Sequence, residues 1–476
     1  MINMPYKIMV LVMIGLVSWS SCQITRPYAS PENKVNERYH SPMSNPKDTT
    51  GQSSLEIDTM NIATLKWSEI FTDTLLQGLI AEGLKANIDI KIAVERITEA
   101  QVNLRLQKAA FLPSLNTNIS ANSQQYPTFQ SFGFPRNNTQ YDVRLSTDWE
   151  IDIWGKLGSA KRAALSQLLA TDAAKRAVQT QLIADIASNY YELLALDQQL
   201  LIIKKTAENR AEDAAAIEML FENALLNGVA VVQSKANFYE AKLDIPDIEQ
   251  KIKEKEHRLS FLVARNPGTI IRQSLKEQQV EYDLKPGIPA QLLAHRPDVQ
   301  MAELNFRTAF EETNVARTYF YPVLKITASG GFSNLGWNQW FSSNSLFGSI
   351  AGGLTQSIFN KGANQARLST AQSRQQQALY QFEKSLLIAS QEVSNALFDY
   401  DTALQKEKSR RKQLDALSQA LEFNKELFLN HQQTNYTDVL AAEQNLLRAQ
   451  LKDIDDQSQK LYAVVQLYRA LGGGWD

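Results

Sequence analysis

The clearest pattern of hydrophobic and polar positions lies in residues 141–153, where the two classes alternate along the whole stretch. A period of two predicts a β-strand with one apolar and one polar face. The apolar row includes Tyr141 and Trp149, and most of the polar row is charged. Such a strand fits lipid on one side and a water-filled lumen on the other, although the edge strand of an ordinary β-sandwich also alternates. The residues that we predict to face a lumen are Asp142, Arg144, Asp148, Glu150 and Asp152.

Residues 113–153 and 322–359 are each predicted to form a β-hairpin, which gives four strands per chain. In the second hairpin, Ile350, Leu354 and Ile358 share one face of the last strand. Four strands cannot close a barrel, and an open edge in hydrocarbon leaves backbone groups unpaired. The chain is therefore expected to oligomerise. Eight strands from two chains would enclose only side chains, whereas twelve strands from three chains would leave an open lumen, so we favour a trimer.

Long helices are predicted where glycine and proline are absent, in residues 159–227 and 363–471. Both stretches are rich in Ala, Gln, Leu, Lys and Glu, which favour helices. Uninterrupted patterns of this length indicate packing like that of a coiled coil. We expect each to belong to a helical hairpin, with turns near residues 223–229 and 431–437, where polar and β-branched residues gather. Shorter helices are predicted before each β-hairpin.

The whole arrangement occurs twice, about 208 residues apart. Asp89 and Pro113 of the first copy correspond to Asp298 and Pro322 of the second, and both pairs are 209 residues apart. A duplication of this period implies two equivalent structural units in one chain. The predicted divisions are a signal peptide (1–21), a lipid-attached N-terminal tether (22–66), a first repeat (67–270), a linker in the equatorial region (271–290) and a second repeat (291–476). The long helical hairpins are predicted at 155–266 and 361–471.

The N-terminus has the pattern of a secretory signal. Lys7 precedes an apolar stretch, residues 8–17, which is too short to span a bilayer. Cys22, the only cysteine of the chain, follows this stretch and two serines. Its position resembles a bacterial lipobox, which predicts acylation of Cys22, for example with palmitate. The alternative is an incidental cysteine at a plain cleavage site.

Composition and charge exclude several classes of function. The chain has 49 Lys and Arg against 51 Asp and Glu, a net charge of −2, which gives no support to nucleic-acid binding. The four histidines lie far apart, and no phosphate loop, nucleophile elbow or Cys/His pair is present. We therefore predict no enzymatic activity, no metal site and no cofactor.

Four motifs in order resemble the TolC-like outer membrane factors, in particular the lipoprotein branch that serves RND-type efflux pumps. They are Arg296-Pro297-Asp298-Val299, Tyr321-Pro322 at the start of a strand, Trp149 to Gly155 at the end of another, and the closing Ala470-Leu471-Gly472-Gly473-Gly474-Trp475. The resemblance implies a mixed α and β membrane protein, a trimer with a twelve-stranded outer-membrane β-barrel continued by a periplasmic α-helical barrel. It also implies passive export of solutes through the bacterial outer membrane, with an inner-membrane RND-type pump and a periplasmic adaptor protein as partners.

In this family the periplasmic tip is constricted by acidic side chains. The family pattern places an aspartate before Val439-Leu440, which here is Asp438, and Tyr436 is the second candidate for the constriction. A ring of three such aspartates would favour cations, whereas an aspartate near the start of a helix is otherwise often a cap. The tip residues implied to contact an adaptor are Asn223, Asn227, Gly228, Gln432, Gln433 and Thr434.

Two other functions stay open on the sequence. One is the outer-membrane channel of a type I protein secretion system, and the other is a lipid-anchored periplasmic scaffold without a pore. The alternating strand at residues 141–153 favours a channel over a scaffold, because a scaffold needs no lipid-facing strand. The exported substrates are not encoded in any motif of the chain.

Overall fold

The computed structural model of the chain describes residues 24–31, 66–125, 127, 137–278, 296–429 and 435–473. The chain divides into two compact units. The first contains residues 96–171 and 301–382 together with the N-terminal residues up to 32. The second contains residues 33–95, 172–300 and 383–476. Cys22 and the tip residues Gln432, Gln433 and Thr434 lie outside the described residues.

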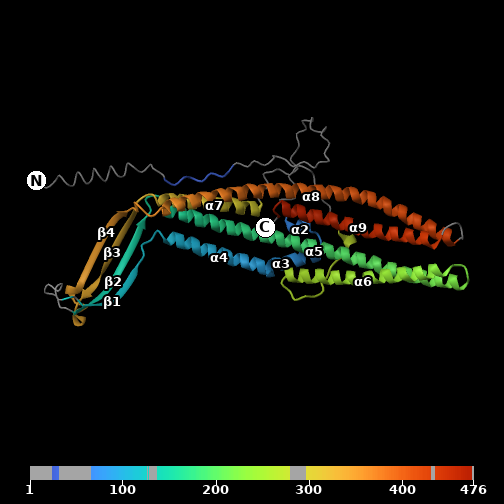
Figure 1. Cartoon of the computed structure of the whole chain (residues 1–476), viewed down its shortest axis with the longest axis horizontal. Helices are drawn as coiled ribbons and strands as arrows, with labels where there is room; N and C mark the ends of the chain where they lie inside the picture. The colour runs from blue at the N-terminus through green and yellow to red at the C-terminus, as the bar shows by residue number, and fades with distance from the viewer. Residues whose placement is uncertain are drawn as a thin grey trace, which may run out of the picture. The chain divides into compact units, whose positions relative to one another are not determined.

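The first unit contains a four-stranded antiparallel sheet in which the strands follow one another in chain order (Figure 1). The strands are β1 (Asn116–Gln125), β2 (Asn137–Ile151), β3 (Val323–Asn334) and β4 (Leu346–Thr355). Both predicted hairpins are present, and β2 pairs with β3 to join them. The last strand is shorter than predicted, because Thr355 pairs with Val323 and the preceding Pro322 has no N–H to extend the ladder. Ile358 therefore lies beyond β4 and is fully exposed.

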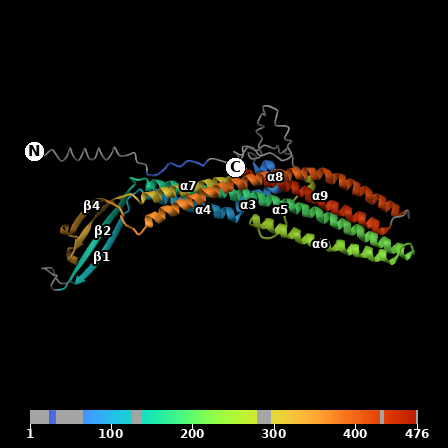
Figure 2. The same cartoon turned by 45° about the horizontal axis from the view of Figure 1, so that its top comes forward.

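The helices repeat in length as well as in order. The 22-residue helices α4 (Ile88–Ala109) and α7 (Pro297–Thr318) precede the two hairpins. The 67-residue helices α5 (Lys156–Glu222) and α8 (Ala363–Leu429) follow them, and the 35-residue helices α6 (Gly228–Leu262) and α9 (Tyr436–Ala470) come last. In two views, α5 lies beside α6 and α8 beside α9 (Figures 1 and 2). Equal lengths in equal order are what two copies of one structural plan produce.

Two short helices, α2 (Trp67–Ile70) and α3 (Thr74–Ala86), precede α4 at the start of the first repeat and were not predicted as separate elements. They contribute to the core of the second unit. Tyr190 and Tyr468, which have no exposed surface, and Phe71, which has almost none, are the most deeply buried of its aromatic side chains. The Tyr190 hydroxyl donates to the Asp73 carboxylate at 2.6 Å, so the buried hydroxyl has a partner.

The Arg-Pro-Asp motif joins the start of one helix to the end of another. Arg296 donates to the Ala470 carbonyl at the end of α9 (2.7 Å) and pairs with the carboxylates of Asp298 and Glu392 (2.8 and 2.7 Å). In the first copy, the Asn87 amide donates to the Leu262 carbonyl at the end of α6 (2.8 Å). In both copies, the residue directly before one helix donates a hydrogen bond to a free carbonyl in the last turn of a second helix. The donor is asparagine in the first copy and arginine in the second.

The ends of α6 and α9 have the same geometry with different residues. Gly472 follows α9 with φ of +96°, and Ala264 follows α6 with φ of 56°. In each case the next residue, Gly473 or Arg265, donates its N–H to the carbonyl five residues earlier. This is the Schellman ending, in which a left-handed residue is normally glycine. Ala264 holds this conformation at a cost that Gly472 avoids.

Part of the predicted N-terminal tether is packed on the first unit. The Asn314 side chain on α7 binds both main-chain groups of Arg26, accepting from its N (3.1 Å) and donating to its O (2.9 Å). The Tyr28 ring contacts Phe306 and Phe310, with centroids 5.9 and 5.6 Å away. We call residues 24–31 the N-terminal strap. Within the predicted tether of residues 22–66, the strap is therefore packed on the first unit, because α7 supplies both its hydrogen bonds and its apolar contacts.

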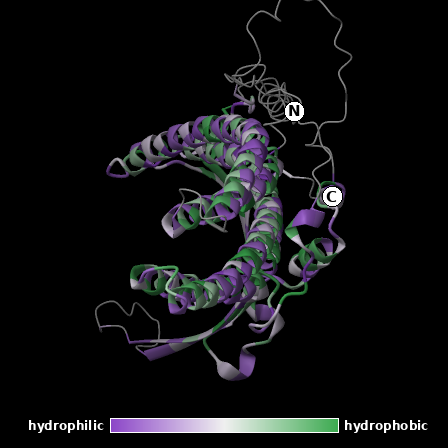
Figure 3. Cartoon of the chain, turned by 90° about the vertical axis from the view of Figure 1, so that its right-hand side faces the viewer, coloured by the Kyte–Doolittle hydropathy of each residue, from purple (hydrophilic) through white to green (hydrophobic). Residues whose placement is uncertain are grey.

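The predicted linker is also anchored where it is described. Arg272 binds Glu256 (2.7 Å) and Asp197, and Leu275 in the short 3₁₀ helix η4 (Leu275–Glu277) is buried. Helices throughout the described residues mix apolar and polar positions (Figure 3). Among these residues, none of the helices combines the length and the apolar character needed to cross a membrane.

Candidate functional site

The sheet has one apolar and one polar face, and strand register decides which residues share each face. Residues directly opposite one another on neighbouring strands point to the same side. The register aligns Ile119, Val143, Phe332 and Leu346 in one row and Ile151, Leu324 and Leu354 in another, with Trp149 and Ile326 between them. Ile119, Leu346, Ile350 and Leu354 are all more than 60% exposed. These side chains of the apolar face are therefore uncovered in the isolated chain, whereas Phe332 packs on the Phe341 ring, with centroids 5.5 Å apart.

The opposite face carries the predicted charged row. Asp142, Arg144, Asp148 and Glu150 all lie on β2. The ladder places Ser120 and Ser333 opposite Asp142, and Lys325 opposite Glu150, so the neighbouring strands extend the polar row. Such an amphipathic sheet can separate an apolar environment from water.

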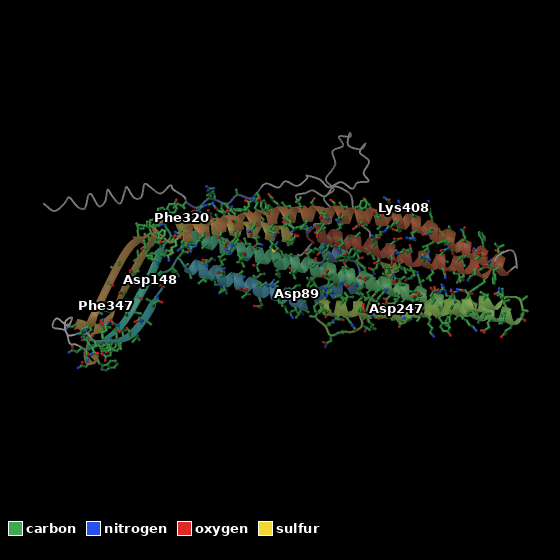
Figure 4. All side chains as sticks on the ribbon, in the orientation of Figure 1. Asp89, Asp148, Asp247, Phe320, Phe347 and Lys408 are labelled. Carbon is green, nitrogen blue, oxygen red and sulfur yellow. The ribbon has the colours of Figure 1, made fainter. Side chains whose placement is uncertain are left out.

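One cation–π contact and one ion pair fix side chains on this polar face. The Arg144 guanidinium lies over the Phe347 ring, 5.3 Å from its centroid, and Phe347 and Asp148 both lie on the sheet (Figure 4). Glu150 pairs with Lys156 at 2.9 Å.

Asp152 does not lie on the strand, contrary to the sequence prediction. The strand ends at Ile151, and the Asp152 carboxylate accepts hydrogen bonds from the N–H groups of Leu157 (3.1 Å) and Gly158 (2.7 Å). These groups belong to the first turn of α5 and have no partner within the helix. Alternation predicted the strand correctly, but it continued by chance into a residue that caps the next helix.

The first helical tip connects α5 and α6. Ala224 has a left-handed φ of 57°, and Asn223 donates its side-chain amide to the Met219 carbonyl at 2.8 Å. Asn227 caps α6 by accepting from the Ala230 N–H at 3.2 Å, and Gly228 is the first residue of that helix. The three predicted tip residues therefore close the turn, and Asn223 and Gly228 are exposed.

At the second tip, Asp438 is the third residue of α9 and forms a capping box with Asn435. The Asp438 N–H donates to the Asn435 side chain at 3.1 Å, and the Asn435 N–H donates to the Asp438 carboxylate at 3.2 Å. Asp438 is exposed, so the cap leaves part of the carboxylate accessible to water. Tyr436 is only half-buried and lies 6.3 Å from the Phe428 ring, centroid to centroid.

A polar network that was not predicted joins the two helical hairpins behind these tips. Lys425 of α8 pairs with Glu443 of α9 at 2.6 Å, and the Asp213 carboxyl of α5 lies within hydrogen-bonding reach of Glu443. Near Tyr436, Arg210 of α5 donates to the Asn237 carbonyl of α6 at 2.9 Å. We call Asp213, Lys425, Tyr436 and Glu443 the inter-hairpin network.

The electrostatics of the network follow from its excess of negative charge. Burial raises the pKa of Asp213, and the Glu443 carboxylate raises it further, while Lys425 opposes both effects. Burial lowers the pKa of Lys425, but its hydrogen bond to Glu443 and the charges around it give a net increase. Burial and the two carboxylates raise the pKa of Tyr436. The raised pKa of Asp213 means that this structure favours its protonated form.

The duplication explains why pattern analysis missed the network. Within the first hairpin, Lys235 of α6 pairs with Glu218 of α5 at 2.6 Å. In the alignment of the two copies, Lys235 corresponds to Glu443, and Glu218 corresponds to a position next to Lys425. The second hairpin therefore has an equivalent ion pair in which the acidic and basic residues have exchanged helices. The exchange puts an acidic group on α9, where it meets Asp213 of α5. A search for charge inversions between the two copies would have identified Glu443, but it would not have shown that Glu443 contacts Asp213.

Among the described residues, no group of three or more His, Cys, Asp or Glu side chains is arranged to hold a metal ion. Together, the sheet and the duplicated helical hairpins define the architectural class of outer-membrane channel proteins. The chain belongs to the outer membrane efflux protein family, whose sequence profile matches residues 79–265 and, a second time, residues 288–473. The two matches coincide with the two copies found in the sequence.

Individual relatives match over nearly the whole chain. The solvent efflux pump outer membrane protein SrpC of Pseudomonas putida is 30% identical over 477 residues, which cover 98% of each chain. The probable outer membrane lipoprotein SilC of Salmonella typhimurium is 26% identical, covering 86% of this chain and 88% of its own. A crystal structure of a membrane protein from Pseudomonas aeruginosa has a TM-score of 0.86 and 26% identity, covering 95% of this chain and 98% of that one.

Proposed function

We propose that this chain is the outer-membrane exit channel of a tripartite efflux system, a passive conduit for solutes that an inner-membrane pump drives through a periplasmic adaptor. The observation that carries the proposal is the sheet, which has an apolar face with most of its large aliphatic side chains exposed and a charged face opposite. Membership of the outer membrane efflux protein family supports the same role. A conduit of this kind contributes a path and a gate, and the pump selects the cargo.

Three chains would form the membrane-spanning part. In the described structure, β1 and β4 each pair with one neighbour only, so both edges of the sheet carry unpaired backbone groups. Such edges cannot stand in hydrocarbon. Pairing β1 of one chain with β4 of the next around a three-fold axis would satisfy both edges and produce a twelve-stranded barrel. Its lumen would be wide enough for water and lined by Asp142, Arg144, Asp148 and Glu150.

The six helical hairpins of a trimer would continue the path into the periplasm. The tip residues Asn223, Asn227 and Gly228, with Gln432, Gln433 and Thr434 of the second tip, would face the adaptor. Asp438 would line the constriction, because its capping role leaves the carboxylate exposed. The inter-hairpin network would hold the tip closed, because the Lys425 ammonium attracts both carboxylates and a protonated Asp213 can donate to Glu443.

The N-terminus would anchor the chain in the same membrane. Cys22 stands directly before Gln23 and the N-terminal strap, so an acyl group on it would lie near the part of the chain that α7 holds. The word lipoprotein in the name of SilC, which is similar over most of the chain, supports acylation. The position proposed for the mature protein is the outer membrane, with its helical hairpins in the periplasm.

Ion conductance of the purified protein in planar lipid bilayers tests the proposal. The expected result is a trimer by light scattering that conducts weakly in the wild type and strongly after substitutions that remove the lysine of the inter-hairpin network, such as Lys425→Met. A trimer with no conductance after such substitutions would favour the scaffold without a pore. A channel that passes an unfolded polypeptide but no small ions when open would favour the secretion role.

A further inference from the structure

Two arginines meet where α7 leads into the sheet. Helix α7 ends at Thr318 and β3 begins at Val323, with Phe320 in the junction between them (Figure 4). Arg317 lies in the last turn of α7, and Arg26 lies in the N-terminal strap.

Both arginines are positioned by the same buried side chain. Asn314 has no exposed surface, and its oxygen accepts from the Arg26 N–H (3.1 Å) and from the Arg317 guanidinium (2.7 Å). Its amide nitrogen returns a hydrogen bond to the Arg26 carbonyl at 2.9 Å. These two hydrogen bonds fix the main chain of Arg26 and do not use its guanidinium group.

The nearest carboxylate is already neutralised. Glu311, one turn earlier on α7, binds the Arg162 guanidinium through both oxygens at 2.7 and 2.9 Å. Within the described ranges, neither Arg26 nor Arg317 forms an ion pair with a carboxylate. Because both arginines bind the same Asn314 oxygen, their positive charges lie near one another. Burial lowers the pKa of Arg317, and the charge of Arg26 lowers it further, as expected for two neighbouring cations.

A role confined to α7 does not explain the pair. A cation in the last turn is favourable for the helix dipole, which accounts for Arg317 alone. Arg26 belongs to another segment, and bringing its charge to the same place adds repulsion. An anion between the two guanidinium groups would remove that repulsion and accept charge-assisted hydrogen bonds from both.

The surroundings of the pair are typical of a membrane–water boundary. The Tyr319 ring lies under the Arg367 guanidinium at 4.0 Å and near the Lys156 ammonium at 5.1 Å, measured from its centroid. Trp154 donates its indole N–H to the Pro322 carbonyl at 2.7 Å and packs on Tyr321. Tyrosine and tryptophan with nearby cations gather at the level of lipid headgroups.

We propose that Arg26 and Arg317 form a binding site for a phosphate group, that of an anionic phospholipid in the periplasmic leaflet of the outer membrane. The proposal rests on the membrane position proposed for the sheet, since only then does the junction lie at headgroup level. The strap would be held both by Asn314 and by the shared phosphate. Acylation of Cys22, four positions before Arg26, would place the acyl chain beside the bound lipid.

Native mass spectrometry of the full-length trimer can measure this binding directly. The protein is titrated with phosphatidylglycerol and, separately, with phosphatidylcholine, in the wild type, Arg26→Gln, Arg317→Gln and the double variant. Each arginine near a lipid headgroup contributes about a fivefold change in affinity. We therefore expect about fivefold weaker phosphatidylglycerol binding in each single variant, about 25-fold in the double variant, and no change for phosphatidylcholine. Arg26→Gln keeps the main-chain hydrogen bonds of the strap, and glutamine at position 317 can still donate to Asn314.

Arg367→Gln is the matched control, because it removes one positive charge from the same junction outside the pair. An equal loss in this variant, or no preference of the wild type for phosphatidylglycerol, would overturn the proposal in favour of a general basic surface. Titration with inorganic phosphate identifies the source of the ligand. If millimolar phosphate displaces the lipid, the site binds a phosphate group and a free ion can also occupy it. If the lipid is retained, the site is specific for the lipid. Wild-type conductance tests the membrane position separately, so a conducting trimer without lipid preference refutes this site and leaves the channel intact.

Discussion

Substitution of Asp213 by asparagine tests how the helical tip is held closed. In the inter-hairpin network, two carboxyl groups compete for one lysine, and burial and the neighbouring Glu443 raise the pKa of Asp213 in the state proposed to be closed. Opening would expose Asp213 to water and return its pKa towards the ordinary value of 3.8. The closed state therefore binds the proton more tightly than the open state. Its relative stability is greatest at low pH and declines as the pH rises through the raised pKa.

Asparagine mimics the protonated form, because it keeps the size of Asp213 and can donate to the Glu443 carboxylate. The change removes one repulsion between like charges and adds one hydrogen bond to a charged acceptor, in a site that is only partly buried. A hydrogen bond of this kind contributes on the order of 1 kcal/mol, and solvent screening keeps the total near that figure. About 1 kcal/mol corresponds to a fivefold lower ratio of open to closed tips per protomer.

Single-channel recording in planar bilayers measures this ratio as the open fraction. For the wild type, we expect the open fraction to fall when the pH is lowered from neutral towards the raised pKa of Asp213. For Asp213→Asn, we expect an open fraction about fivefold lower at neutral pH and a weaker response to acid. Glu212→Gln removes the same charge from the adjacent, exposed position of α5 and serves as the control. An Asp213→Asn channel that opens more than the wild type, or a control with an equal effect, would refute the reasoning.

Three further changes test other parts of the structure. Asp438→Ala is expected to raise conductance, because it removes three carboxylates from the proposed constriction; Asp438→Asn retains the cap, and wild-type conductance in both variants would exclude the role. Ala264→Gly is expected to stabilise the protein by about 1 kcal/mol in urea unfolding followed by circular dichroism, and Gly472→Ala to destabilise it by at least as much, because both positions are left-handed; opposite signs would contradict the assignment of the helix ends. Arg272→Met is expected to lower stability by about 3 kcal/mol at neutral pH, because Glu256 is buried. Burial raises the pKa of Glu256, but Lys253 and Arg272 together hold it below 4.5, so the loss should shrink as the pH falls below that value; a loss that is independent of pH would count against the ion pair.

The part of the fold that depends on local patterns could be predicted from the sequence. Alternation at residues 141–153 predicted β2, and the absence of glycine and proline predicted α5 and α8 as long helices. The same local rule extended β2 to Asp152, because alternation cannot distinguish the last strand residue from a helix cap. It also extended β4 to Ile358, since the ladder ends at the start of the neighbouring strand β3, which Pro322 directly precedes.

The candidate site could be predicted only where its residues lie in a turn or a strand. Asn223, Asn227 and Gly228 were placed correctly at a tip, because polar residues and glycine interrupt a helical pattern. Asp213 and Glu443 are 230 residues apart, and no spacing relates them. The N-terminal strap was predicted as a tether, because its composition is polar and its binding surface on α7 is nearly 300 residues away.

The sequence by itself determined the duplicated plan, the order of the elements and the face that each β2 residue presents. These follow from periods of two and 3.6 residues and from conformational preferences, which act over a few neighbouring residues. Only the tertiary structure decided which acidic group of α9 meets α5, where the strap lies, and which two arginines share Asn314. These contacts depend on the way in which the long helices pack against one another. Packing brings residues into contact that are more than 200 positions apart in the sequence. The copies are alike where local rules act, and they differ at Glu443 and Lys235, where packing gives one ion pair a third partner.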